Sequence, residues 1–309
     1  MRRALVGPKL KERGARLSLA HAPALLLLTC LLPPVAFAAQ TDEALLETGR
    51  ASRLRQPPAN PTEIKVISYN IRWREGEELR KIIELLKTDA ALGHAALIGL
   101  QEVDRNKGRT HHTNTARELA EALGMYYAWA APPAPPAKGK AQEMEEETGV
   151  EILSPYPLTE VRRIVLPVEG PSGRRRVALG ATVKIGPSTL RFYSVHAETR
   201  ISVEQKTEQL RAVLADMAQH TQAQPAIVLG DFNTWQPNAA REVKQLFTRA
   251  GFTTPFPAEQ ATFYRNILIG VIEIKLDWMW LRGVRPLRFG IARKVEISDH
   301  WPLWADVKL

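Results

Sequence analysis

The feature that most constrains this chain is an apolar run that ends in two polar side chains. Residues 227–234 have the sequence Ile-Val-Leu-Gly-Asp-Phe-Asn-Thr, so the run stops at Gly230 and is followed by Asp231 and Asn233. Such a run is typical of a buried strand of an α/β sheet, where ligand sites lie at the carboxyl ends of the strands. In an extended chain, side chains two residues apart point to the same side, so Asp231 and Asn233 can converge on one ligand. An Asx turn without a functional role is the alternative.

Five other short stretches carry polar side chains in a comparable way. In chain order they are Ile67-Ser68-Tyr69-Asn70-Ile71, Leu100-Gln101-Glu102-Val103, Ser194-Val195-His196, Lys275-Leu276-Asp277-Trp278 and Ser298-Asp299-His300. Together with residues 230–233, and in this order, they resemble the motifs of the endonuclease/exonuclease/phosphatase superfamily, which has the deoxyribonuclease I-like fold. The resemblance extends from about Ile64 to the end of the chain. An ordered set of six motifs is far more specific than any one of them.

The periodicity of apolar residues predicts an α/β fold with mixed sheets, because strands and helices alternate early and hairpin-like strands follow. The resemblance implies two mixed β-sheets packed face to face with helices on the outside, a four-layer sandwich. The expected strands are 64–71, 96–102, 149–154, 175–185, 189–196, 227–231 and short ones near Phe263, Leu276 and Leu303. One expected helix begins at Glu77, and three others cover 113–123, 205–220 and 239–250. Thr113 is the expected N-cap of the helix over 113–123.

The first 38 residues have the layout of a secretory signal peptide. A basic head precedes an apolar run, which closes at Ala36-Phe37-Ala38, a small-residue triplet of the cleavage type. A membrane anchor is the rival interpretation, but prolines interrupt the run and it falls short of a span of ~20 residues. We therefore expect a signal peptide over 1–38, a linker over 39–62 and the endonuclease/exonuclease/phosphatase domain over 63–309. The protein is then exported, to the periplasm or the extracellular space.

Cleavage changes what the composition implies. It removes six basic residues and one acidic residue, which lowers the formal net charge from +9 to +4 and leaves 271 residues. That length suits one large domain. A mild positive charge is compatible with a phosphate-bearing partner but does not argue for one. The only cysteine, Cys30, is also removed, so neither disulfides nor thiol chemistry are expected.

Asn70, Glu102 and Asp299 are the predicted metal-binding residues. Magnesium prefers oxygen ligands and usually takes only one or two carboxylates. Glu102 would supply a carboxylate and Asn70 a carbonyl oxygen, and the resemblance implies that both hold the metal. Asp299 could reach either the metal or the attacking water. The expected cofactor is Mg²⁺, with Mn²⁺ as an alternative.

His196, Asp231, Asn233, Asp277 and His300 are the predicted catalytic residues. The resemblance implies that Asp231 is the general base for water, that Asn233 bonds a phosphate oxygen, and that His196 is an imidazole on the phosphate. His300 would donate to the phosphate or the leaving oxygen. Asp277 would hold the other nitrogen of His300, a common way to fix the tautomer of a catalytic imidazole.

Departures from the family patterns narrow the branch. Arg72 stands where the abasic-site endonucleases have an aspartate, and Leu276 where inositol-phosphate 5-phosphatases have a cysteine. His196 favours the nuclease I and general phosphodiesterase branch. Glu151 stands where many members have a small residue. Arg105 and Arg109 follow Glu102 and could either grip a phosphate or be solvated.

These residues predict an exported, Mg²⁺-dependent phosphodiesterase or nuclease, expected to be a monomer without a stable protein partner. One alternative is a phospholipase of sphingomyelinase type, which often has an exposed aromatic hairpin that enters lipid. The sequence shows no such hairpin beyond Trp278 and Trp280, which are expected in a strand core. A catalytically inactive binding protein is the other alternative. The Pro- and Glu-rich segment 130–147 predicts a surface loop, or a rim over the site. The substrate stays undecided, because it depends on loop shape and electrostatics.

Overall fold

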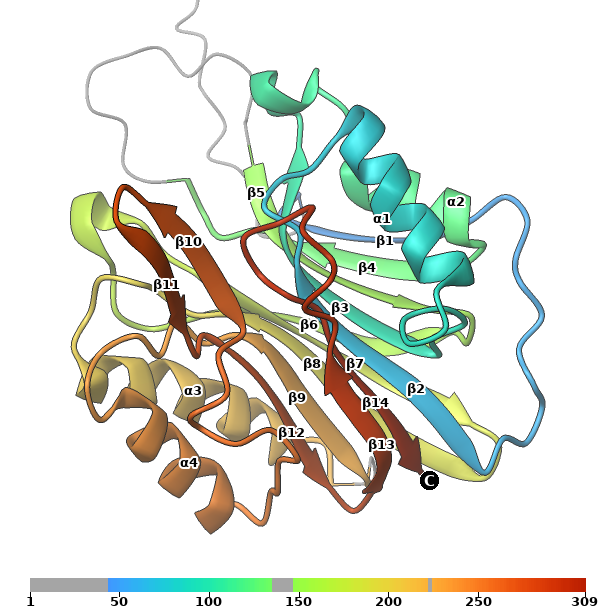
Figure 1. The fold of residues 1–309 in the computed structure, drawn as a ribbon. Helices are drawn as coiled ribbons and strands as arrows, with labels where there is room; N and C mark the ends of the chain where they lie inside the picture. The colour runs from blue at the N-terminus through green and yellow to red at the C-terminus, as the bar shows by residue number, and fades with distance from the viewer. Residues whose placement is uncertain (1–43, 135–146, 222–223) are drawn as a thin grey trace, which may run out of the picture. The chain divides into compact units, whose positions relative to one another are not determined.

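The computed structural model describes residues 44–134, 147–221 and 224–309. The predicted signal peptide over 1–38 and most of the predicted loop over 130–147 lie outside the described residues. Within the described residues the fold is built from two mixed β-sheets and four α-helices (Figure 1), which confirms the predicted fold class.

The larger sheet has seven strands in the order β1-β4-β5-β3-β2-β14-β13 within the described chain. Only β2 and β3 pair in parallel, and the other neighbours are antiparallel. The strands are β1 (Leu46–Arg50), β2 (Glu63–Asn70), β3 (Leu97–Arg105), β4 (Tyr126–Ala130), β5 (Glu147–Ser154), β13 (Arg285–Ile291) and β14 (Leu303–Lys308).

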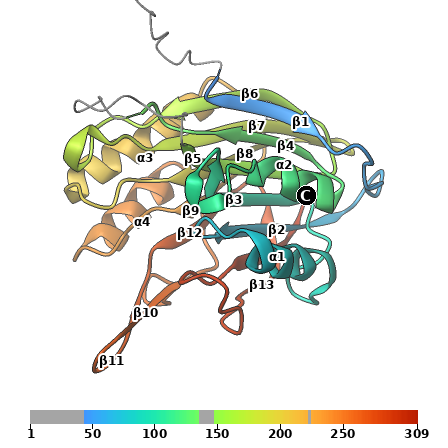
Figure 2. The same ribbon diagram turned by 90° about the horizontal axis from the view of Figure 1, so that it is seen from above.

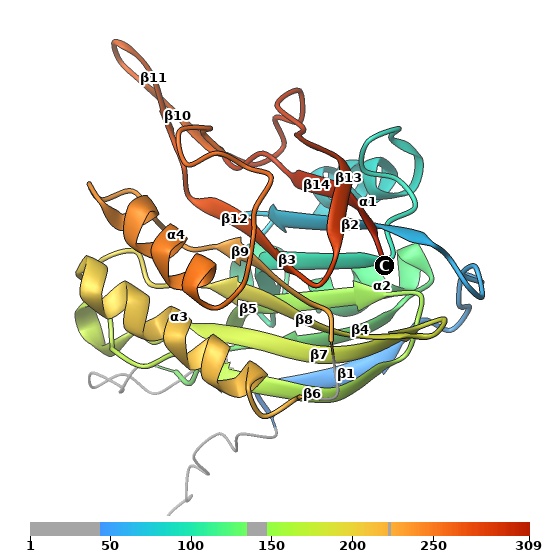
Figure 3. The same cartoon turned by 90° about the horizontal axis from the view of Figure 1, so that it is seen from below.

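The smaller sheet has five described strands in the order β12-β9-β8-β7-β6, of which β8 and β9 pair in parallel. They are β6 (Leu158–Val165), β7 (Val177–Ile185), β8 (Ser188–His196), β9 (Ala226–Asp231) and β12 (Asp277–Arg282). The predicted hairpin is confirmed as β7 and β8. A separate two-stranded ribbon, β10 (Phe263–Ile267) with β11 (Gly270–Ile274), projects beside them (Figures 2 and 3).

Helices cover the outer face of each sheet (Figures 1 and 3). The apolar sides of α1 (Gly76–Thr88) and α2 (Thr115–Leu123) join Ile67 and Leu100 of the seven-stranded sheet in one buried cluster. Those of α3 (Val203–Met217) and α4 (Ala239–Arg249) join β8, β9 and β12 in another. Two 3₁₀ turns, Gly108–Thr110 and Pro171–Gly173, complete the described helical segments. No described helix has both the length and the apolarity needed to cross a membrane.

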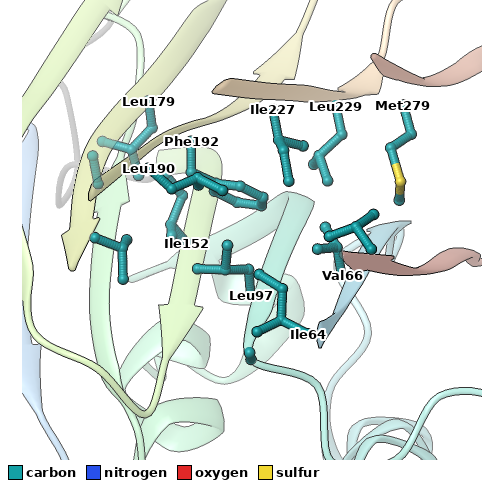
Figure 4. Packing of buried hydrophobic residues seen from close by; sticks show 14 of the residues in the cluster. Ile64, Val66, Leu97, Ile152, Leu179, Leu190, Phe192, Ile227, Leu229 and Met279 are labelled. Carbon is teal, nitrogen blue, oxygen red and sulfur yellow. The ribbon is translucent and has the colours of Figure 1, made fainter. Parts of the chain in front are cut away.

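The main core lies between the two sheets (Figure 4). Alternation along the strands creates it: in β2, Val66 faces the other sheet while Ile67 faces the helices. Leu229 of β9 enters this core from the smaller sheet. Opposite it, Gly99 of β3 leaves room for that side chain, because a Cβ at Gly99 would lie 2.3 Å from Leu229.

Two local predictions are corrected. Part of the predicted linker over 39–62 is strand β1, which pairs with β4 at the edge of the larger sheet. That pairing joins residues far apart in the chain, so the local sequence carries no signal for it. The second helix is confirmed, but its N-cap is Asn114 and not Thr113, because the Asn114 side chain accepts from the Arg117 amide.

Candidate active site

The register of three neighbouring strands places three predicted catalytic side chains in a row. His196 at the end of β8 lies opposite Asp231 at the end of β9, and Asp277 at the start of β12 lies on the other side of Asp231. Directly opposed residues present their side chains on the same face of a sheet. Sheet pairing therefore brings together residues that are up to 81 positions apart in the sequence.

Gly230 is required by the close approach of the neighbouring strand. Its φ of +134° is a conformation that residues with a side chain rarely adopt, and a Cβ there would lie 2.0 Å from the Val195 carbonyl oxygen. After Asp231 the strand ends, and Asn233 has a left-handed φ of +53°. The two side chains therefore meet through a turn and not, as predicted, along an extended chain.

The turn itself is an Asx turn. The Asn233 amide donates to Asp231 Oδ1 over 2.9 Å, and Asn233 Nδ2 donates to the Ala197 carbonyl over the same distance. The Asx turn is thus confirmed, and the convergence of Asp231 and Asn233 on one ligand stays a prediction. Asp231 orders the turn with one oxygen, and its second oxygen faces the other site residues.

Glu102 comes from the opposite sheet on a β-bulge. Strand β3 does not end at Glu102, as predicted, but continues to Arg105 with a register shift between Gln101 and Val103. Glu102 has a left-handed φ of +58° at this bulge. Bulges re-aim a side chain, and uncommon backbone conformations of this kind cluster at functional sites. Here the bulge turns Glu102 towards the end of the smaller sheet.

Asn70, at the end of β2, ties the two carboxylates together. Its Nδ2 donates to Asp231 Oδ2 over 3.1 Å and lies 3.3 Å from Glu102 Oε1. The Arg72 amide donates to Asn70 Oδ1 over 3.0 Å, which fixes the orientation of the amide group. The nitrogen of Asn70 therefore faces the carboxylates, whereas the sequence predicted that its carbonyl oxygen would face a metal beside Glu102.

His300 is held by two carboxylates. Its Nδ1 lies 2.9 Å from Asp277 Oδ2, and its Nε2 lies 3.8 Å from Asp231 Oδ2. Burial alone would lower the pKa of His300, but Asp277 and Asp231 together raise it to about 10. The imidazole is therefore a protonated cation at neutral pH, bonded through Nδ1 and with Nε2–H directed towards Asp231.

Asp231 is buried, and its pKa lies close to neutral pH. Burial raises the pKa of Asp231 to about 6, while the His300 cation opposes the rise and Asp277 adds to it. A carboxyl group with that pKa is ionised at neutral pH yet basic enough to accept a proton, as a general base must be.

His196 differs from His300 because it faces carboxylates on one side only and a cation, Arg176, on the other. Its Nε2 lies 3.6 Å from Asp231 Oδ2, but its Nδ1 lies 3.4 Å from Arg176 Nη1. Burial, followed by the charge of Arg176, lowers the pKa of His196 well below its usual value. The two site histidines thus differ in charge at neutral pH: His196 is neutral and His300 is cationic.

A group of charged side chains beside His196 was not predicted from the sequence. Arg174 and Arg176 both pair with the fully buried Glu198 carboxylate, at 2.9 Å and 3.1 Å. The Lys206 Nζ also donates to the Glu198 carbonyl, and burial lowers the pKa of Lys206 to about 8. The run of three arginines at 174–176 just before β7 was the available signal.

The residues offer two places for a divalent cation. Ligand atoms of Asp231, Asp277 and His300 lie within 4.8 Å of one another. However, His300 is cationic there and already bonded to Asp277, so a second cation would be repelled. Glu102 Oε2 is a better ligand, because it is buried and has no hydrogen-bond partner among the described residues. An unpartnered carboxylate oxygen is what a hard cation requires.

The site lies in a cleft of about 350 Å³. All the predicted site residues except Asn70 and Asp277 line this cleft. Asp299 also lines it and pairs with Arg72 over 3.2 Å. The walls are apolar; they are formed by Trp73, Trp235, Phe263, Ile274 and Leu276. None of these wall residues was predicted to belong to the site.

Arg105 and Arg109 do not line this cleft. Arg105 pairs with Glu47 and Glu147, and Arg109 makes two hydrogen bonds to Asp104. Both are therefore engaged in ion pairs. Arg109 is also exposed to solvent, as one of the two alternatives predicted, whereas Arg105 is mostly buried.

Comparisons with known proteins give the same picture of the fold. Residues 67–300 match the family model described as Endonuclease/Exonuclease/phosphatase family. Among solved structures, an endonuclease/exonuclease/phosphatase from Beutenbergia cavernae superposes with a TM-score of 0.61 at 19% identity, covering 81% of this chain and 72% of that one. The sequence has no significant match among curated proteins.

Two other solved structures carry functional titles. D. rerio TDP2 complexed with single strand DNA product has a TM-score of 0.57 at 19% identity, with 81% of this chain and all of that one covered. ANGEL2, a 2',3'-cyclic phosphatase, in complex with adenosine-2',3'-vanadate, has a TM-score of 0.58 at 15% identity, with 80% and 96% covered. At these identities the likeness shows the fold.

Proposed function

Because the chain belongs to the endonuclease/exonuclease/phosphatase family, whose members hydrolyse phosphate esters, we propose that it is a metal-dependent phosphodiesterase or nuclease. One observation carries the proposal. His300 and Asp231, a cation and a base, lie side by side at the floor of a cleft, and Glu102 adds an unpartnered carboxylate oxygen. An acid next to a base, both within reach of one cleft, is what hydrolysis of a phosphate ester requires.

Each side chain has a role that follows from its surroundings. His300 donates its Nε2 proton to a phosphate or leaving oxygen, and Asp277 stabilises the cation that makes this donation possible. Asp231 accepts a proton from the attacking water, because its pKa of about 6 leaves it ionised at neutral pH. Asn70 holds Asp231 in position. The neutral His196 presents Nε2 as a hydrogen-bond donor.

Mg²⁺ is the proposed cofactor, with Mn²⁺ as a substitute. Glu102 would hold it, and the ion would neutralise charge that develops on the phosphate. Asp299 is already paired with Arg72, so a role for it at the metal would require that ion pair to rearrange.

A second candidate is a phospholipase of sphingomyelinase type. The sequence predicts no exposed aromatic hairpin. The β10–β11 ribbon is an exposed hairpin, but the side chains at its tip are aliphatic and not aromatic. Its exposure was not predicted, because the aliphatic residues 267–272 have the composition of a buried segment. Trp278 and Trp280 do lie in the strand core, as expected.

A substrate screen tests the proposal. Purified protein is assayed on plasmid DNA, a chromogenic phosphodiester, a phosphomonoester and sphingomyelin, each with Mg²⁺, with Mn²⁺ and with excess chelator. We expect diester hydrolysis that chelation abolishes and either ion restores. Full activity in chelator would exclude the metal role, and activity on the phosphomonoester alone would exclude a phosphodiesterase.

We also propose that the protein is exported, on the basis of the basic head and apolar run before Ala38. N-terminal sequencing of protein recovered outside the cytoplasm should begin at or near Ala39. Recovery of the chain with Met1 intact from the cytoplasm would exclude export.

A further inference from the structure

The β10–β11 ribbon exposes an unusual amount of apolar surface. Five of the eight large apolar side chains that are exposed in the described chain lie within residues 267–272. Leu268 is 105% exposed and Ile269 is 92% exposed, so neither packs against the body of the protein. Figures 2 and 3 show this ribbon projecting from the sheets. Soluble monomers rarely expose a contiguous apolar patch without a binding role.

The register of the ribbon shows that its end is apolar all round. Ile267 pairs with Gly270, and Ile272 pairs with Arg265, two positions before Ile267, so both isoleucine side chains lie on one face. Val271 lies on the opposite face, and Leu268 and Ile269 form the turn between the strands. A folded protein partner covers one face of a ribbon. A lipid bilayer surrounds an inserted one, so lipid fits this distribution better.

The polar boundary of the ribbon supports the same occupant. Residues 266–272 contain no charged side chain, and Arg265 and Glu273 flank them on the two strands. Tyr264 stacks on Trp301 with ring centroids 5.0 Å apart, and the Arg293 guanidinium lies 4.4 Å from the same ring. Tyrosine, tryptophan and arginine are the side chains that favour the interface between lipid and water.

The ribbon is fixed to the active site at its base. The Tyr264 amide donates to the Asp299 carbonyl over 2.9 Å, and the Trp301 amide donates to the Thr262 carbonyl over 2.7 Å. The Phe263 ring lies edge-on to the His300 ring at 5.0 Å. The orientation of the tip is therefore set by the same segment that carries His300.

Apolar side chains on one face of the ribbon lead from the cleft towards the tip, with Arg265 as the one charged residue on that face. Phe263 and Ile274 line the cleft and are paired across the ribbon. By strand alternation they lie on the same face as Ile267 and Ile272. Five residues of strand span about 16 Å, and interfacial elements typically penetrate ~5–10 Å, so only the end of the ribbon would enter the acyl region.

We propose that residues 267–272 insert into a lipid bilayer and hold the cleft at the level of the headgroups. This docking does not require the proposed hydrolytic activity, because it depends on the ribbon alone. It gives the active site access to phosphate esters that are presented at a membrane surface.

Vesicle flotation of the full chain tests the proposal. Vesicles of phosphatidylcholine, with and without phosphatidylserine, are used with the wild type and with the double variant Leu268→Ser/Ile269→Ser. We expect the wild type to float with the vesicles. The double variant should partition about a hundredfold more weakly, since each aliphatic side chain removed from lipid is worth roughly tenfold. The matched control is Leu287→Ser, which removes an exposed leucine (37% exposed) from β13 and should bind like the wild type.

Two further readouts separate the outcomes. Hydrolysis of a soluble chromogenic phosphodiester should be the same in all variants, because none of the changed residues lines the cleft. Vesicle binding without any hydrolysis would contradict the proposed function and leave the docking proposal standing. Failure of the wild type to float, or equal flotation of the double variant, would overturn it. So would a wild-type dimer that fails to bind vesicles and is lost in the double variant, because the ribbon would then join two copies of the chain.

Discussion

Two buried carboxyl groups in different parts of the molecule, Asp231 and Glu151, show what distinguishes a functional site from simple burial. Both lie in strands, and burial raises the pKa of each. Asp231 accepts hydrogen bonds from Asn70 and Asn233 and lies 3.8 Å from His300. Both carboxylate oxygens of Glu151 lack a hydrogen-bond partner within the described residues.

Their positions in the sheets explain the difference. Asp231 ends its strand, where β2, β3, β8, β12 and the loop that carries His300 all contribute polar side chains. Glu151 lies in the middle of β5, paired between Leu100 and Trp129, in a largely apolar layer beneath the helices. In both regions the raised pKa indicates burial. Of the two carboxyl groups, only Asp231, at its strand end, also has hydrogen-bonding and charged partners within the described residues. Substitutions in the two regions should show whether function depends on such hydrogen-bonding and charged partners.

The largest effect is expected for His300→Ala. The proton that His300 donates is needed in the transition state, so kcat should fall ~10²–10³-fold while KM changes little. The measurement is steady-state kinetics on the diester that the screen identifies, with folding checked by circular dichroism. His111→Ala, at a side chain that is 80% exposed, is the matched control and should be unchanged. If a folded His300→Ala protein keeps nearly wild-type kcat, the region of Asp231 contributes no more to activity than the region of Glu151.

Asp277→Asn should cost somewhat less, ~10²-fold in kcat. The Asp277 carboxylate raises the pKa of His300, so without it the imidazolium loses its proton at a lower pH. The alkaline limb of the pH–rate profile should therefore move to lower pH. Because the pair acts as one unit, Asp277→Asn combined with His300→Ala should be little worse than His300→Ala alone. Multiplied losses in the double variant would instead mean that the two residues act independently.

The strand ends of the site could be predicted from the sequence, and the parts set by distant pairing could not. Asp231 and His196 follow apolar runs, so their positions at strand ends were visible locally. The bulge at Glu102 depends on the register of β3 against β5. The direction of the Asn70 amide nitrogen depends on Asp231, 161 positions away. Neither has a local signature.

Two other features were hidden for a different reason. The aliphatic residues 267–272 at the end of the β10–β11 ribbon have the composition of a core segment, and only the three-dimensional structure shows that they are exposed. The converse holds for Glu151, a charged residue that composition places at the surface and the structure places in the interior. Residue type predicts burial on average, and these two elements are exceptions in opposite directions.

Glu102→Gln should raise the metal requirement with a smaller effect on the maximal rate. The substitution removes the carboxylate charge but keeps the shape, and the unpartnered Oε2 is the proposed ligand atom. We expect the Mg²⁺ concentration for half-maximal activity to rise at least about tenfold, in line with changes at ligating groups. Metal titrations of wild type and variant measure this. An unchanged titration would direct attention to the group formed by Asp231, Asp277 and His300.

Of these variants, Glu151→Gln should change activity least. In place of a loss of activity, it should produce a gain in stability. Because the pKa of Glu151 is raised well above its ordinary value of 4.5, the folded protein keeps a proton that the unfolded chain loses above pH 4.5. The free energy of unfolding then decreases as pH rises from 4.5 to the folded pKa, by about 1.4 kcal/mol per pH unit. Glutamine does not ionise, so the variant should match the wild type near pH 4.5 and exceed it increasingly above. Urea unfolding across this pH range is the measurement, with Glu118→Gln on the exposed side of α2 as the control that should show no such trend. A difference independent of pH, or a loss of hydrolysis in Glu151→Gln, would mean that Glu151 has partners of its own and that the contrast with Asp231 fails.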